Sequence, residues 1–305
     1  MTHGRALAGM LIVTLMWSTA GVVSRQLEHA ASFEVTFWRS LFTALSLGVY
    51  LGWQHGRGIG ALLAGGAGRR QALWISGFMW SAMFTCFMVA LTLTTVANVL
   101  ITMSVAPLFT ALLARFTLGH PVAPRTWLAI LIAGGAIGWM YASGLSADPK
   151  SLFGSLVALG VPIAAAINWN TLQRSGTSVD LAPALLIGAV ISCLVTLPLS
   201  MPFQASAPDI GWLALLGVFQ LAVPCVMAVR IARGLSGPEI ALQALLEIVF
   251  GIAWAWLGAG EQPPPQVLVG GAIVLTTLAL NELVGMRSRR SRDAKAVSDR
   301  CSGMA

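Results

Sequence analysis

The stretch Leu235–Glu261 reads LSGPEIALQALLEIVFGIAWAWLGAGE and decides the fold of the chain. Its apolar part, Ile240–Leu257, approaches the length of a membrane span, because a helix rises about 1.5 Å per residue and needs roughly 20 residues to cross the hydrocarbon core. Glu247 lies near the middle of this part. A carboxylate at that depth is unfavourable unless it is protonated, paired or facing water. We therefore expect Glu247 to serve the function of the protein.

The same stretch has a weak counterpart earlier in the chain. Thr94–His120 aligns with Leu235–Glu261 when the two are superimposed end to end, and Gly119 then meets Gly260. The alignment places a polar helix start, a mid-helix irregularity and a closing glycine at equivalent positions. It indicates two copies of one unit.

Composition places the chain in a membrane. The sequence has 305 residues, of which 57% are hydrophobic and 10% are charged, whereas soluble domains carry about 25% charged residues. Residues 72–114 contain no Asp, Glu, Lys, Arg or His. As a straight helix this run would measure roughly 65 Å, enough for two membrane crossings. The sequence predicts an integral membrane protein that crosses the bilayer several times.

Apolar segments follow one another along the whole chain. Ten have cores at Leu7–Val23, Val35–Trp53, Ala72–Leu91, Val96–Leu118, Trp127–Tyr141, Leu152–Trp169, Leu181–Leu199, Trp212–Val229, Ile240–Leu257 and Val267–Val284. Only Thr92–Thr95 separates the third from the fourth, which predicts a tight turn. Pro107, Pro162 and Pro224 predict interrupted helices, because proline lacks an N–H and clashes with the carbonyl four residues earlier. We expect the first segment to be an uncleaved helix rather than a secretory signal.

The basic residues predict the orientation. With the N-terminus in the cytoplasm, fifteen of the eighteen Lys and Arg residues fall on the inner side, Arg25 and Lys150 fall outside, and Arg39 lies within the second segment. Cytoplasmic loops are enriched in basic residues. Both termini are therefore expected in the cytoplasm, with the protein in the inner membrane. Residues 287–305 are expected to form a basic, disordered cytoplasmic tail.

The two units then have opposite orientations. A unit of five helices crosses the membrane an odd number of times, so a second copy must run inverted. Inverted repeats are typical of secondary transporters, which bind substrate near the midplane between them. We expect an all-α integral membrane protein with ten transmembrane helices in two inverted repeats of five, residues 1–145 and 146–286.

Short motifs along the chain resemble one family. They are Met16-Trp17-Ser18, Phe37-Trp38-Arg39, Ala106-Pro107, Leu245-Leu246-Glu247 and Leu257-Gly258-Ala259-Gly260-Glu261. In this order they resemble the drug/metabolite transporter superfamily, in its EamA-type branch, from about Gly9 to Met286. The resemblance implies a basket of ten helices around a central cavity and the movement of small metabolites, often the export of amino acids. Ile248 and His120 depart from the pattern, which usually has Pro and Glu there.

The expected substrate-binding residues are polar or aromatic side chains within the segments or at their ends. They are Trp17, Arg39, Trp80, Asn98, Thr102, Asn168, Gln243 and Glu247. Glu247 either binds a cationic group or a coupling proton, or it bonds to neighbouring helices. For Arg39 two interpretations are open: it meets a substrate carboxylate, or it reaches the outer interface or pairs with Glu34, which we favour.

The other candidates have equally open interpretations. Trp17 and Trp80 either stack on a planar or cationic substrate or pack in the core. The amides and hydroxyls of the set either line a wet pathway or form hydrogen bonds between helices.

Other classes of protein lack their motifs in this sequence. It contains no GxxxxGK[ST] phosphate loop, and its four histidines fall in loops or at segment ends. Its four cysteines form no CxxC motif, and we interpret those in apolar segments as small core residues. We therefore expect no enzyme, catalytic residue, cofactor or metal site, and we do not interpret the net charge of +7 as nucleic-acid binding.

The leading hypothesis is a secondary transporter that moves a small metabolite, an amino acid or related compound, out across the inner membrane by alternating access. One alternative is a facilitative carrier of a planar solute such as a vitamin or nucleoside. Another is a membrane scaffold or sensor that transports nothing. Expected partners are a small-molecule substrate, membrane lipid and protons as a coupling ion, with the chain acting as a monomer or homodimer.

Overall fold

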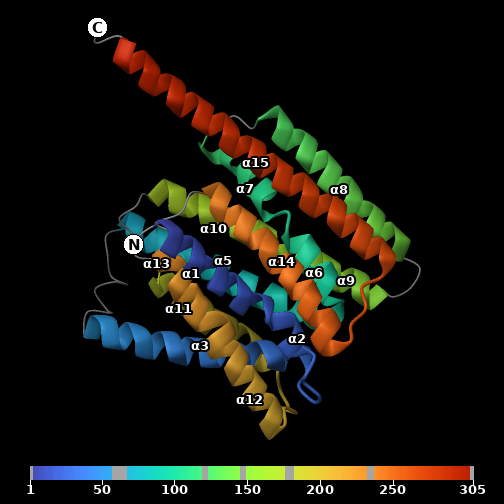
Figure 1. Ribbon diagram of the computed structural model, residues 1–305. Coiled ribbons are helices and arrows are strands. Elements are labelled where there is room, and N and C mark those ends of the chain that lie inside the picture. Colours follow the sequence, from blue (N-terminus) through green and yellow to red (C-terminus); the bar gives the residue numbers. More distant parts are fainter. Residues whose placement is uncertain are drawn as a thin grey trace.

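The computed structural model describes residues 3–56, 67–118, 123–144, 149–175, 182–231 and 237–302. All regular structure in these ranges is helical, and the helices pack side by side (Figure 1). Six helical stretches among the described residues are long and apolar enough to cross a membrane: Gly4–Ser24, Gly68–Leu93, Val96–Thr117, Pro149–Asn168, Ala207–Ala228 and Pro265–Gly285. The prediction of an all-helical membrane protein is confirmed.

The helices follow the apolar segments of the sequence. Before residue 145 they are α1 (His3–Ser18), α2 (Ala20–Ser24), α3 (Ser32–His55), α5 (Ala67–Leu93), α6 (Val96–Met103), α7 (Ala106–Leu118) and α8 (Pro124–Gly144). After it they are α9 (Pro149–Ala158), α10 (Gly160–Ser175), α11 (Ala182–Thr196), η2 (Leu197–Leu199), α12 (Ala207–Leu215), η3 (Leu216–Ala222), α13 (Val223–Ile231), α14 (Gly237–Ala259) and α15 (Pro265–Ser302).

The predicted helix interruptions are confirmed at Pro107 and Pro162. A proline ring collides with the carbonyl four residues earlier, and α6 ends at Met103, four residues before Pro107. In the same way α9 ends at Ala158, four residues before Pro162. Before Pro224 the chain forms the π-helical segment η3 instead of breaking. Wider π turns release backbone carbonyls and are frequent at functional sites.

The predicted tight turn between the third and fourth segments is also confirmed. α5 ends at Leu93 and α6 begins at Val96. Thr95 is the N-cap of α6, and its hydroxyl accepts a hydrogen bond of 3.2 Å from the Asn98 N–H. A threonine at this position satisfies one of the first N–H groups of a helix and so starts α6 without glycine or proline.

Small residues allow the helices to approach closely. α5 lies in the middle of the packing and contacts α9, α10, α11 and α3. Where α5 crosses α11, a Cβ atom added to Gly188 would lie 2.5 Å from the Cβ of Trp80. Membrane helices associate largely through such close packing of small residues, because lipid gives no hydrophobic drive between them.

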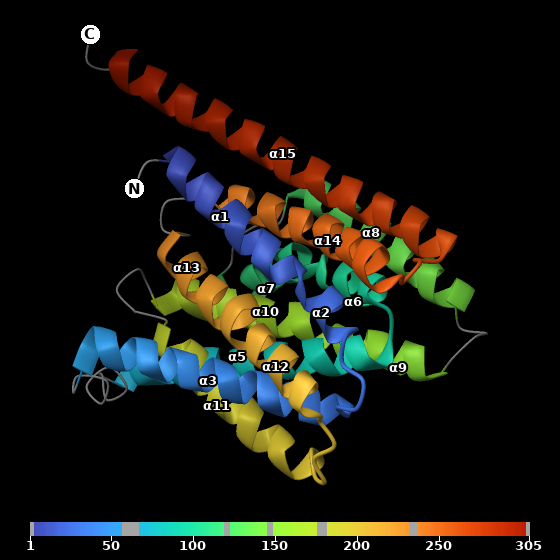
Figure 2. The ribbon, with the colours of Figure 1, turned by 60° about the horizontal axis from the view of Figure 1, so that its bottom comes forward.

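α15 corrects one expectation. Arg287–Ser302 was expected to be disordered, but it continues α15 as a helix of 38 residues that extends past the rest of the bundle (Figure 2). No glycine or proline occurs between Arg287 and Ser302, and Arg, Ala and Lys favour helix. Nothing in this stretch therefore ends the helix that the last apolar segment begins. α15 packs beside α8 (Figures 1 and 2).

Candidate functional site

Arg39 is buried among the helices. Only 2% of its surface is exposed. Its Nη2 donates a hydrogen bond of 2.9 Å to the Oε1 of Gln220, and its Cζ lies 5.8 Å from the centre of the Phe87 ring. Nε and Nη1 have no hydrogen-bond partner among the described residues. Arg39 thus brings a positive charge with unused donors into a packed membrane protein.

The favoured interpretation of Arg39 is wrong. Its guanidinium neither reaches an interface nor pairs with Glu34. The Glu34 carboxylate instead accepts hydrogen bonds of 2.9 Å from the backbone N–H groups of Gln204 and Ala205. The reason is the register of α3, which begins at Ser32 and so places Arg39 two turns inside the helix, beside η3.

Gln220 holds Arg39 in place from η3. While its Oε1 accepts from Arg39, its Nε2 donates 3.1 Å to the carbonyl oxygen of Trp17 on α1. Both ends of the amide are therefore used, and Gln220 joins α1 to α3. Gln220 is also the residue whose carbonyl the ring of Pro224 displaces from regular helical bonding. The π-helical segment and the amide bridge thus occur at the same residue.

A glycine permits the approach of η3 to α3. A Cβ atom added to Gly217 would lie 2.6 Å from the carbonyl oxygen of Arg39. The Thr43 hydroxyl lies 3.0 Å from the carbonyl oxygen of Gly217 and 2.8 Å from that of Arg39. Only a residue without a side chain fits between these backbones, so Gly217 sets the distance across which Arg39 and Gln220 meet.

Trp17 links this group to Cys225, which is buried. Trp17 and Trp80 pack against one apolar cluster that includes Cys225. Arg39, Gln220, Trp17, Trp80 and Cys225 therefore form one group, which we call the Arg39 cluster. Glu247 is partly exposed on α14, which packs against α1.

The remaining predicted residues lie elsewhere. Asn98 donates 3.0 Å from Nδ2 to the Thr94 hydroxyl, and the Thr102 hydroxyl bonds to the Asn98 carbonyl oxygen at 2.7 Å, both on the α6 side. The buried Asn168 accepts a hydrogen bond of 2.6 Å from Ser76 between α10 and α5. Gln243 lies on α14 one turn before Glu247, and its side chain is outside the described residues.

Sequence reasoning did not select two members of the Arg39 cluster as site residues. Gln220 is one of several amides within apolar segments and is not in the expected set, and Cys225 was interpreted as a small core residue. The spacing of Gln220 four residues before Pro224 was the available signal, because a proline in a membrane helix frees a carbonyl at that position. For Cys225 the sequence offers no comparable signal.

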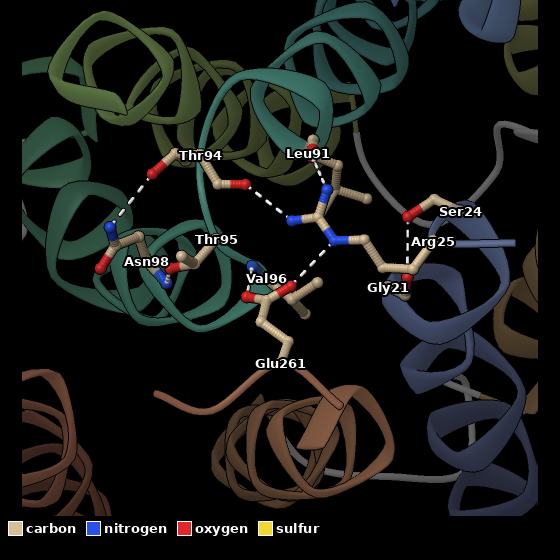
Figure 3. A network of polar contacts seen from close by, with 9 residues as sticks. All are labelled: Gly21, Ser24, Arg25, Leu91, Thr94, Thr95, Val96, Asn98 and Glu261. Atoms are coloured by element: carbon tan, nitrogen blue, oxygen red, sulfur yellow. Dashed lines mark hydrogen bonds and ion pairs between the residues drawn. The ribbon is translucent and has the colours of Figure 1, made fainter. Parts of the chain in front are cut away.

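A second polar group, the Arg25 network, joins one end of several helices (Figure 3). Arg25, just after α2, donates through Nη1 to the Leu91 carbonyl oxygen and through Nη2 to that of Thr94, each at 2.8 Å. Its Nε lies 2.8 Å from Oε2 of Glu261. Oε1 of Glu261 accepts a hydrogen bond of 2.7 Å from the Val96 N–H. Arg25 thus caps the end of α5, and Glu261 caps the start of α6.

Comparisons with known proteins agree with this architecture. Residues 4–142 match the model of the EamA-like transporter family. The pseudopaline exporter CntI of Pseudomonas aeruginosa, in strains UCBPP-PA14 and PAO1, is 26% identical over 287 residues, which are 90% of this chain and 96% of the relative.

A solved protein crystal structure shares the fold. It superimposes with a TM-score of 0.64 at 17% identity and covers 94% of this chain and 99% of the other. The family match and the distant exporter relative point to a transporter rather than an enzyme. Over residues 4–142 the chain is therefore similar to the EamA-like transporter family.

Proposed function

We propose that the chain is a secondary transporter that exports a small polar metabolite, an amino acid or related compound, across the inner membrane by alternating access. The observation that carries this proposal is Arg39, a buried arginine whose Nε and Nη1 have no partner within the described part of the chain. A protein that merely spans a membrane gains nothing from such a charge, whereas a transporter uses it to select what passes.

The energetics favour an anionic partner for Arg39. Removing a cation from water without pairing it costs several kcal/mol. Gln220 and the Phe87 ring offset part of this cost, but both are neutral. A carboxylate on the substrate would complete the pairing. Arg39 is then the anion-recognising residue and Gln220 positions it.

Glu247 supplies the opposite charge. It is partly exposed on α14, which packs against α1, the helix that carries Trp17. In the proposed transporter Glu247 binds the cationic group of the substrate or carries a coupling proton. Trp17 and Trp80, together with Asn98, Thr102, Asn168 and Gln243, complete the proposed pathway.

The proposed architecture is ten crossings in two inverted repeats, residues 1–145 and 146–286. It is supported by the overlap of every apolar segment with a helix or a broken helix. The start of α1 and the end of α15 lie at the same end of the bundle (Figures 1 and 2). Together with the distribution of basic residues, this supports a cytoplasmic location for both termini.

The direction of transport rests on the relative. The pseudopaline exporter covers nearly the whole of this chain, which supports export here. A facilitative carrier of a planar solute is the second candidate, and it is favoured by the aromatic side chains near Cys225, where the rings of Trp80 and Phe84 lie 5.5 Å apart. Stacking surfaces of this kind bind planar ligands.

Counterflow tests the proposal. Purified protein in proteoliposomes is loaded with a pooled set of amino acids, organic acids, amines, vitamins and nucleosides, and exchange is read by mass spectrometry. We expect exchange of carboxylate-bearing compounds, lost in Arg39→Gln. Exchange of vitamins or nucleosides alone supports the planar carrier. No exchange by folded protein supports a scaffold and contradicts the proposal.

A further inference from the structure

We propose that Arg25 and Glu261 form a latch, an ion pair that closes one end of the helix bundle and separates whenever the transporter opens there. The latch lies outside the Arg39 cluster and serves conformational change rather than substrate recognition. It rests on the proposed function in one respect: transport must require this end of the helix bundle to open.

The latch joins parts of the chain that are far apart in sequence. Arg25 bonds to Leu91, 66 positions away, to Thr94, 69 positions away, and to Glu261, 236 positions away. Through these bonds the end of α2, the turn between α5 and α6, and the segment after α14 meet at one guanidinium (Figure 3). These elements cannot separate while the Arg25 network is intact.

Glu261 is placed for this role by the end of α14. Gly260 adopts a positive φ of 64°, and the Glu261 N–H bonds at 3.1 Å to the Ala255 carbonyl oxygen. Helices often end in this way, and the left-handed residue turns the chain back over the last turn. The side chain of Glu261 is thereby directed at α6 and Arg25, and it remains attached to the rigid end of α14.

Water reaches the pair. The exposed fractions of the Arg25 and Glu261 side chains are 29% and 16%. Partly exposed ion pairs are weakly stabilising, because water replaces each bond when the pair separates. The latch can therefore open and close repeatedly within a functional cycle.

Two other carboxylates that accept backbone hydrogen bonds are more deeply buried. Glu34 and Asp209 are 0% and 1% exposed. Each accepts bonds from backbone N–H groups of loops, from Gln204 and Ala205 in the first case and from Glu28 and His29 in the second. These buried carboxylates anchor loops. Glu261 is more exposed, and it pairs with the charged side chain of Arg25.

A buried acceptor lies just inside the latch. The Oδ1 of Asn98 is buried and has no partner among the described residues, while Nδ2 of the same side chain bonds to Thr94, whose carbonyl accepts from Arg25 (Figure 3). Separation of Arg25 from Thr94 would free this turn and give Asn98 access to water. Accessibility at residue 98 is therefore a direct readout of the latch.

A disulfide provides the first test. A Cβ atom added to Gly258 lies 3.9 Å from the Cβ of Val22, within the range of about 3.5–4.5 Å found in disulfides. Val22→Cys/Gly258→Cys would therefore join α2 to α14 one turn from the latch, leaving Arg25 and Glu261 in place. Mass spectrometry of peptides confirms the bond.

We expect oxidation to reduce counterflow by about tenfold or more and reduction to restore it, since a closed end cannot take part in alternating access. The single variants Val22→Cys and Gly258→Cys are the controls and should not respond to oxidant or reductant. Equal counterflow by the oxidised and reduced double variant would overturn the latch. If neither this variant nor the native protein shows counterflow, the result contradicts the proposed function and not the latch.

The second test needs no transport. Asn98→Cys is labelled with a membrane-impermeant trimethylammonium methanethiosulfonate, and the native protein gives the background of its own cysteines. Adding Glu261→Gln should raise the labelling rate by about tenfold, because local opening becomes more frequent. Adding Asp209→Asn, which alters a buried cap, should leave the rate unchanged. Equal rates with and without Glu261→Gln would contradict the proposal whether or not a substrate is known.

Discussion

The Arg39 guanidinium and the Gln220 amide are joined by a hydrogen bond of 2.9 Å between α3 and η3. The amide holds the arginine in place without neutralising it. A carboxylate at this position would have formed an ion pair and left no charge for a ligand. With glutamine at position 220, Arg39 is held in place and still keeps its charge for a ligand.

Gln220→Glu should neutralise the charge of Arg39. A glutamate would pair with Arg39 and compete with the substrate for its charge, so KM should rise by about tenfold or more, as for other close charge pairs. The melting temperature should stay the same or rise, because the cation gains a partner. Counterflow at graded substrate concentration measures KM. Gln220→Glu with unchanged KM would exclude Arg39 as an anion-binding residue.

Arg39→Lys and Arg39→Gln should both reduce counterflow, and Arg39→Gln should reduce it more. A lysine keeps the charge but replaces the planar guanidinium by a compact ammonium, so we expect partial counterflow from Arg39→Lys and loss of about a hundredfold in Arg39→Gln, the size of a truncated buried charge contact. Fluorescence-detected size exclusion shows whether each variant is folded. Equal activity of Arg39→Gln and the native protein would contradict the assignment.

Glu247→Gln tests proton coupling. An amide is nearly the same shape as the acid but cannot carry a proton, so the variant should still exchange substrate and should lose its response to an imposed pH gradient. Uptake into vesicles with and without the gradient makes the measurement. If the variant keeps the response of the native protein, Glu247 has no role in proton coupling.

Gly217→Ala should separate η3 from α3. The added Cβ would lie 2.6 Å from the Arg39 carbonyl oxygen and 2.7 Å from the Cβ of Phe42. We expect the free energy of unfolding to fall by about 1–3 kcal/mol, which is typical of overpacking. The counterflow rate should fall by more than this loss of folded protein explains. Gly211→Ala is the matched control, since no atom lies within 4 Å of its added Cβ. Similar behaviour of the two variants would show that the contact is dispensable.

Much of the fold could be predicted from the sequence, because its signals are local. Long apolar runs define the helices, and Pro107 and Pro162 lie four residues after the ends of α6 and α9. The tail was misjudged because charge was taken to mean disorder, whereas Arg287–Ser302 lacks any residue that ends a helix. The charge of this stretch was given more importance than the helix propensity of its residues.

The site depends on contacts that no local pattern contains. Arg39 and Gln220 are 181 positions apart, and their meeting is set by the register of α3 and by the absence of a side chain at Gly217. From the sequence, Arg39 is close enough to a segment end for its long side chain to reach the interface. The position of Arg39 in its segment does not reveal the π turn of η3 or the neutral partner, Gln220, that this turn contains.

The continuation of α15 has a practical consequence for imaging the protein. Arg287–Ser302 remains helical, so it carries Ser302 roughly 24 Å beyond the last apolar residues. A fluorescent protein fused there would stand clear of the bundle. Because its attachment is a helix and not a flexible linker, the polarisation of its emission would report how the whole molecule is oriented in a supported bilayer.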